Sequence, residues 1–241
     1  MPRKLWIPIA ALAALLVLGG GGAYAYFFSG LRTSPPTLAL ASPSPSASGT
    51  ASPTAGTTGS GTWTIASGSL AGYRVKEQFV GQSSSHEAVA RTTAVSGQAT
   101  ITFSGTTYEL SAATITVQLS NLASVDSVAG YNVTNRDRIV QQSLNVSSFP
   151  TAVFVARSVT LPAGASAGQT VTVSAPGTLT IHGVTKDVTA NLQLHVSGSA
   201  TQIAGTIATN MTDFGVNPPS IGFTTVQPAV TIEVSLNLTQ S

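Results

Sequence analysis

The 241-residue chain contains no cysteine. A disulfide framework, a catalytic thiol, a cysteine metal site and a lipid anchor on an N-terminal cysteine are therefore excluded. Charged residues are also scarce: they make up 7% of the chain, against about a quarter of an ordinary soluble domain. The formal net charge is +2 and no basic cluster follows the N-terminus, so the sequence lacks the electrostatic pattern of a nucleic-acid-binding protein.

The sequence also lacks the motifs of common catalytic and cofactor sites. It has no phosphate loop, no dinucleotide fingerprint and no HExxH motif, and the spacing of its three histidines (His86, His182 and His195) does not suggest a metal site. His86 follows three serines, but there is no GxSxG elbow and no evident third member of a triad. We therefore expect no cofactor, no metal and no enzymatic activity. An enzyme would require His86 or His182 beside a carboxylate in a polar pocket with a shifted pKa.

The first feature that is present is an uncharged apolar run. Arg3 and Lys4 precede residues 5–28, which carry no charge and are about long enough to cross a bilayer as a helix. Basic residues tend to stay cytoplasmic, so residues 1–28 are predicted to be a cytoplasmic stub and a transmembrane anchor that places the rest outside the cytoplasm. The alternative is a signal peptide cleaved near Ala23-Tyr24-Ala25, which would release a secreted protein.

Residues 29–62 are dominated by Ser, Pro, Thr, Ala and Gly. Most of this stretch has neither charge nor large apolar side chains, so it cannot bury enough surface to offset the entropy of ordering. We expect a disordered linker, stiffened in places by proline, that holds a folded domain away from the membrane.

The remainder, residues 63–241, reads as a single mostly-β domain. Residues 188–196 and 230–239 alternate apolar with polar side chains, which is typical of strands with one buried face. The stretch 177–196 predicts a hairpin that reverses at His182-Gly183. Residues 73–79 also alternate, although Glu77 falls on the apolar side. Several strands spaced in this way predict a sandwich or an up-and-down barrel.

One segment of the domain is not of β type. Residues 135–143 predict a short helix, with Asn135 as its N-cap and Asp137 in the first turn. The chain then reaches Phe149-Pro150, where the proline favours an extended backbone at the residue before it.

Three stretches of the domain resemble the YceI-like family, also called polyisoprenoid-binding domains. They are Asn135-Arg136-Asp137 through Ser143 with Phe149-Pro150 and Phe154; GTLTIHGVTK at residues 177–186; and MTDFGV at residues 211–216 with the final alternating strand. The likeness spans residues 63–238. It implies an elongated, lipocalin-like antiparallel β-barrel with one short helix, which binds a polyisoprenoid or similar amphiphilic lipid along its interior.

On this resemblance we expect aromatic residues to line the barrel, the candidates being Phe79, Phe103, Phe149, Phe154, Phe214 and Phe223. Candidates for contacting a polar headgroup are Arg136, Asp137 and His182. Arg136 and Asp137 have an alternative reading, in which a helix cap and an ion pair fix the helix over the barrel.

The predicted function is that of a membrane-anchored, extracytoplasmic carrier whose partners are a long-chain lipid and the membrane. The alternative is a structural or adhesive surface domain whose barrel is filled by its own side chains. Large inward-facing residues on every strand would favour that alternative.

Overall fold

The computed structural model describes residues 32–40, 60–81, 85–104, 107–128, 133–197 and 199–241. Within these ranges no helix is long and apolar enough to span a membrane. The predicted anchor, residues 1–28, lies outside the described residues, as does most of the predicted linker.

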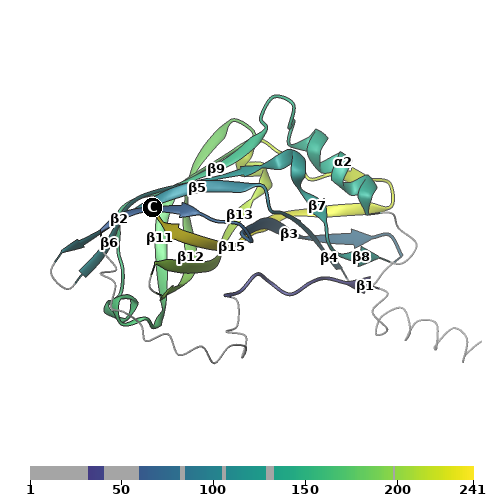
Figure 1. Cartoon of the computed structure of the whole chain (residues 1–241). Coiled ribbons are helices and arrows are strands. Elements are labelled where there is room, and N and C mark those ends of the chain that lie inside the picture. Colours follow the sequence, from purple (N-terminus) through teal and green to yellow (C-terminus); the bar gives the residue numbers. More distant parts are fainter. Residues whose placement is uncertain (1–31, 41–59, 82–84, 105–106, 129–132, 198) are drawn as a thin grey trace, which may run out of the picture.

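Eight strands of the described chain form a closed antiparallel barrel (Figure 1). They are β2 (Gly61–Ile65), β5 (Val95–Ser104), β6 (Thr107–Gln118), β9 (Thr151–Ala156), β11 (Thr170–Ile181), β12 (Val184–Ser197), β13 (Ala200–Asn210) and β15 (Thr224–Gln240). Their order is β13-β12-β11-β9-β6-β5-β2-β15, and pairing of β13 with β15 closes the ring. The predicted mostly-β barrel with one short helix is thus confirmed.

At one end of the barrel the sheet is extended by three further strands. β3 (Leu70–Phe79) pairs with the first part of β15, β4 (His86–Thr92) pairs with β3, and β7 (Ala123–Ser124) pairs with β4. The helix α2 (Thr134–Ser143) lies over β7 at this end (Figure 1). We call it the α2 end of the barrel.

The remaining elements are short. Four are two-residue strands: β1 (Arg32–Thr33), β8 (Ser127–Val128), β10 (Val159–Thr160) and β14 (Ser220–Ile221). Three are 3-10 helices: η2 (Leu119–Asn121), η3 (Ala163–Ala167) and η4 (Met211–Phe214).

The hairpin of β11 and β12 forms as predicted. The two strands pair from Thr170 opposite His195 to Ile181 opposite Val184. The turn residues His182 (φ 53°) and Gly183 (φ 74°) are both left-handed, as a two-residue turn matching the strand twist requires. A Cβ on Gly183 would lie only 2.6 Å from the Phe149 ring, so glycine is needed here for space as well as for conformation.

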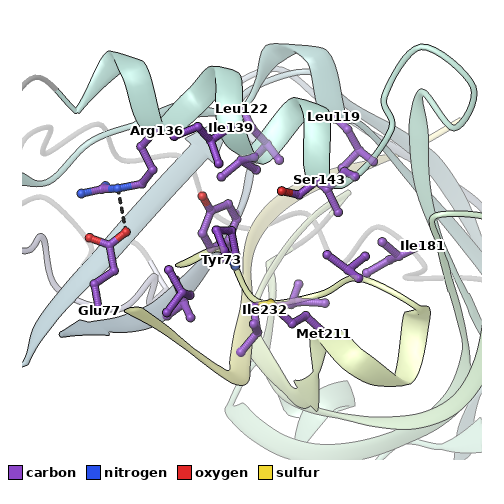
Figure 2. Close-up of a pocket in the computed structure, with 18 of the residues that line it drawn as sticks. Tyr73, Glu77, Leu119, Leu122, Arg136, Ile139, Ser143, Ile181, Met211 and Ile232 are labelled. Carbon is purple, nitrogen blue, oxygen red and sulfur yellow. Dashed lines mark ion pairs between the residues drawn. The ribbon is translucent and has the colours of Figure 1, made fainter. Parts of the chain in front are cut away.

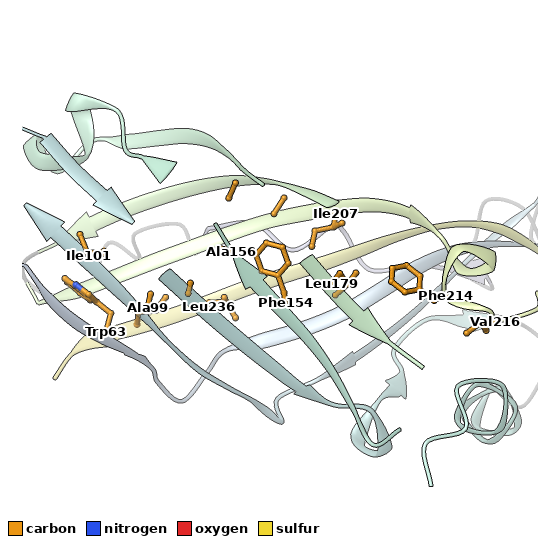
Figure 3. Packing of buried hydrophobic residues seen from close by; sticks show 14 residues of the cluster. Trp63, Ala99, Ile101, Phe154, Ala156, Leu179, Ile207, Phe214, Val216 and Leu236 are labelled. Atoms are coloured by element: carbon orange, nitrogen blue, oxygen red, sulfur yellow. The ribbon is translucent and has the colours of Figure 1, made fainter. Parts of the chain in front are cut away.

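The buried apolar residues form a row along the barrel axis, from Trp63 at one end to Phe214 and Val216 at the other (Figure 3). Alternation along each strand turns one set of side chains inward. Many inward positions carry alanine, on successive strands of the ring: Ala99, Ala113, Ala156, Ala175 and Ala190. Such small side chains cannot reach the barrel axis, so this core lines the barrel without filling it.

Two local features differ from the sequence-based expectations. α2 begins at Thr134, and the residue before it, Val133, makes no side-chain cap hydrogen bond, so Asn135 is inside the helix and the predicted N-cap is wrong. Residues 32–40 fall in the predicted linker, yet they lie against the outside of the barrel. The reason is that two arginines on the sheet bind their backbone carbonyls.

Candidate ligand-binding cavity

Two cavities lie end to end inside the barrel. The larger, of about 330 Å³, is at the α2 end, and the smaller, of about 120 Å³, is in the closed ring. Four residues line both: Ala71, Val117, Ala152 and Ile232. They form the neck where the two cavities meet.

The smaller cavity owes its volume to small residues on neighbouring strands. Alanine or glycine faces it from seven different strands, at Ala71, Ala99, Ala113, Ala152, Ala175, Ala190 and Gly205. Larger apolar side chains close its far end, among them Trp63, Ile101 and Leu238. The lining is almost entirely apolar, so it suits hydrocarbon and offers few hydrogen-bonding partners to water.

The larger cavity lies between the sheet and the elements packed over it (Figure 2). Leu119 and Leu122 come from η2 and the residue that follows it, and Ile139 comes from α2. Across the space lie Tyr73 of β3 and Ile232 of β15. The fold therefore builds this cavity from segments that are far apart in the sequence.

A cluster of charged side chains borders the larger cavity. Glu77 points inward from β3, and its Oε1 lies 3.0 Å from Arg136 Nε of α2 (Figure 2). The same guanidinium donates to both carboxylate oxygens of Asp126, at 2.7 and 3.1 Å. Asp126 also accepts from Val89 N–H at 3.0 Å and lies 2.7 Å from His86 Nε2. Arg136 thus links α2 to β3 through Glu77 and to the segment before β8 through Asp126.

The two carboxylates that share Arg136 have pKa values shifted in opposite directions. Burial alone would raise the pKa of Asp126, but hydrogen bonds from His86, Arg136 and Val89 outweigh it and lower the pKa to about 2. At Glu77, burial dominates and raises the pKa despite the neighbouring Arg136. Burial likewise raises the pKa of the Tyr73 hydroxyl, which stays neutral at physiological pH.

The pairing of His86 with Asp126 meets part of the condition set above for an enzyme, since a histidine lies beside a carboxylate with a shifted pKa. Both side chains are buried, however, and neither lines either cavity. A molecule held in the barrel would not touch them. Their position instead ties β4 to the segment that leads into β8.

The six phenylalanines predicted to line the barrel have different positions. Phe79, Phe214 and Phe223 border the larger cavity and Phe154 borders the smaller one. Phe103 borders neither: it is 42% exposed and packs on the Tyr108 ring, 4.6 Å between centroids.

Phe149 also borders neither cavity, because its ring packs outside them against the hairpin turn, 5.1 Å from the ring of His182. Of the three headgroup candidates, only Arg136 borders a cavity. Asp137 accepts from Ser124 N–H at 3.0 Å and from its hydroxyl at 2.6 Å, which fixes α2 to β7. His182 Nδ1 lies 3.2 Å from the Phe214 carbonyl oxygen.

Sequence reasoning missed most of the cavity lining, including Tyr73, Leu122 and Ile139. One signal was available: Glu77 interrupts the apolar face of its strand, which suggests a charged partner inside the barrel. The sequence analysis allowed an ion pair that fixes the helix over the barrel, but it did not identify Glu77 and Asp126 as the partners of Arg136.

A family model described as "YceI-like domain" matches residues 63–238. The search of curated proteins finds no match to this sequence.

Several solved structures resemble the fold. A polyisoprenoid binding domain from Saccharophagus degradans, implicated in plant cell wall breakdown, aligns over 74% of this chain and 98% of its own, with 14% identity and a TM-score of 0.51. Burkholderia cenocepacia BcnA aligns over 68% and 95%, with 18% identity and a TM-score of 0.46. The Campylobacter jejuni YceI protein aligns over 68% and 84%, with 18% identity and a TM-score of 0.37.

Proposed function

Because the chain belongs to the YceI-like domain family, we propose that it is a binding or carrier protein for a polyisoprenoid or similar amphiphilic lipid. The observation that carries the proposal is the pair of apolar cavities that lie next to each other at the neck. Burial of a hydrocarbon chain there would contribute about 0.8 kcal/mol per methylene group. The name of the Saccharophagus degradans domain points to the same class of ligand.

The cavities also bear on the alternative of a filled structural domain. That alternative predicted large inward residues on every strand, whereas alanine and glycine face the smaller cavity from seven strands. The open interior supports a carrier in preference to a filled barrel.

The charges around the cavity favour a neutral headgroup. Arg136 is the one cation among the described residues that line the larger cavity, and it is already bound to Glu77 and Asp126. A diphosphate would have to compete with two carboxylates for this guanidinium and would lie beside a negative charge. An alcohol or carbonyl group would need only one hydrogen bond.

We further propose that residues 1–28 anchor the protein in a membrane with the barrel outside the cytoplasm. The support is the uncharged run at residues 5–28 behind Arg3 and Lys4. A carrier of a water-insoluble lipid benefits from being held beside the membrane that supplies it.

Lipid extraction from the full-length protein tests the binding proposal. The chain is made in its native host, purified in mild detergent and analysed by native mass spectrometry before and after organic extraction. A stoichiometric lipid with a long apolar chain is expected. After delipidation, a polyprenol should bind more tightly than the polyprenyl diphosphate of the same length. Protein that retains no lipid and takes up neither would refute the proposal.

A further inference from the structure

Residues 32–40, which we call the strap, lie along the outside of the barrel (Figure 1, purple). Arg32 and Thr33 pair with β8. Beyond them, Ser34 Oγ donates to the Glu87 carbonyl, Leu38 N–H donates to Glu233 Oε2 at 3.1 Å, and the Ser235 hydroxyl donates to the Ala39 carbonyl. The strap is thus bound along its length.

The strap covers a cluster of charged residues on the outward face of the sheet. Glu233 is fully buried and accepts from Arg74 Nε at 2.7 Å and from Arg91 Nε at 2.8 Å. The same arginines donate to the carbonyl oxygens of Pro35 and Pro36. Both prolines favour extended backbone, which forms no internal hydrogen bonds, so these two carbonyls are free to accept from the arginines.

Gly72 allows Arg91 to reach Glu233. The register places Gly72 directly between them, opposite Arg91 on one side and Glu233 on the other. A Cβ on Gly72 would lie 2.9 Å from Arg91 Cγ and 2.2 Å from the Ala90 carbonyl oxygen. The outer face therefore has the space that this cluster requires, and the strap shields the cluster from water.

Strand register shows that the strap begins at the α2 end. His86 lies opposite Glu77 near the end of β3, and Ser34 binds the Glu87 carbonyl beside it. From there the strap runs inward to Ala39, which contacts Ser235 opposite Leu70 at the start of β3. Arg32, the first residue of the strap, therefore lies at the α2 end.

Exposed apolar side chains occur at the same end. Val80 is 74% exposed and Phe223 is 48% exposed, and Val80 N–H donates to the Phe223 carbonyl at 2.9 Å. Phe223 also lines the larger cavity, so its ring lies where that cavity meets the solvent. We call these two residues the apolar corner.

We propose that the strap holds the α2 end of the barrel against the lipid bilayer, with the apolar corner in its surface. This inference rests on the proposed anchor at residues 1–28. Only residues 29–31 separate Phe28 from Arg32, so the start of the strap lies at most about 14 Å from the end of the apolar run. The longer low-complexity stretch, residues 41–59, follows the strap and cannot act as a spacer between anchor and barrel.

This arrangement gives the cavity a direct exchange route. An apolar chain leaving the bilayer would meet Phe223 and then the larger cavity without crossing bulk water. Amphipathic surfaces of this kind insert their apolar residues into the boundary between headgroups and acyl chains.

The absence of cysteine makes the inference easy to test, because a single introduced cysteine carries a unique label. Val80→Cys reports on the apolar corner. Phe103→Cys, exposed at the opposite end of the barrel, is the matched control. Each full-length variant is labelled with a fluorophore and reconstituted in liposomes containing lipid-attached quenchers. The label at position 80 should be quenched several-fold more than the label at position 103.

Two insertion variants distinguish positioning of the barrel by the strap from attachment through a flexible tether. A 20-residue Gly/Ser insertion between Gly30 and Leu31 should abolish the difference between the two labels, because it separates the anchor from the strap. The same insertion between Thr50 and Ala51 should leave the difference unchanged, because it lies after the strap. Equal quenching of both labels, or equal effects of both insertions, would overturn the inference while leaving the anchor intact.

Two further results would also overturn it. Release of the protein from liposomes by alkaline carbonate would refute the anchor and this inference together, while lipid binding would remain testable. Efficient disulfide crosslinking of Val80→Cys between two copies would show that the corner binds another copy in place of lipid.

Discussion

Glu77 of β3 and Arg136 of α2 meet at 3.0 Å beside the larger cavity, and this contact joins the one α-helix of the described chain to the sheet beneath it. Arg136 also binds Asp126, so the helix is held by two carboxylates of different character. Breaking a buried ion pair by removing one partner is costly, whereas a charge that is already unfavourable can be removed with little loss.

We predict that the two carboxylates respond oppositely to neutralisation at pH 7. Asp126→Asn should destabilise the protein by about 2 kcal/mol, because the lowered pKa of Asp126 measures how strongly the fold favours its charged form. Glu77→Gln should leave the stability unchanged or raise it, because burial makes the fold disfavour a charge on Glu77. Denaturant unfolding of both variants measures the difference. A Glu77→Gln loss as large as that of Asp126→Asn would contradict it.

The neck between the cavities should determine how long a chain the barrel accepts. Ala152→Phe would fill the point where the two cavities meet. We expect the variant to retain short-chain lipids and to lose long ones, as measured by native mass spectrometry of a mixture of chain lengths. Val155→Phe on the same strand is the control, because Val155 is 42% exposed and faces away from both cavities. An identical chain-length distribution in all three proteins would show that the smaller cavity takes no part in binding.

The sequence predicted those features that depend on local pattern. Alternation placed the last strand and the hairpin, and Gly183 marked the turn because few other residues adopt its conformation. The strand at His86–Thr92 was missed, because it is buried on both faces and carries charged residues where alternation would show apolar ones. Its arginine and glutamate are compensated by partners on β3, β15 and the strap, which are far away in the sequence.

The candidate site was less predictable than the fold. Which phenylalanine faces the barrel interior depends on strand register and on where each strand ends. Phe103 and Phe149 therefore lie outside both cavities. The sequence does not indicate which alanines leave the barrel interior open, since alanine is compatible with either face of a strand. The sequence did not predict that the strap is bound to the barrel. Composition indicates only how little apolar surface a segment can bury, whereas the strap is bound through its carbonyl oxygens.

Loss of one of the two sheet arginines that bind the strap should loosen the strap without unfolding the barrel. Arg91→Met removes the bonds to Glu233 and Pro36 while keeping most of the side-chain volume. We expect the free energy of unfolding to fall by about 2 kcal/mol, and we expect faster tryptic cleavage after Arg32. Arg157→Met is the control: its ion pair with Asp187 is largely exposed, and such pairs contribute about 0–1 kcal/mol. Equal protease resistance of Arg91→Met and the unaltered protein would show that the strap is held by other contacts.

Acid should destabilise the protein through Asp126 in a defined pH range. A group whose pKa is lowered on folding contributes stability above its unfolded pKa, and this contribution is lost as the pH falls through the folded value. For Asp126 the range runs from its ordinary pKa of 3.8 down to about 2, and the expected loss is about 2 kcal/mol.

Glu77 acts in the opposite sense. Its pKa is raised on folding, so its contribution is fully present below its ordinary pKa and is lost as the pH rises through the folded value. Urea unfolding as a function of pH should therefore show a shallower acid loss in Asp126→Asn than in the unaltered protein, whereas any advantage of Glu77→Gln should disappear in acid. Parallel pH profiles for all three proteins would mean that Arg136 does not distinguish between its two partners.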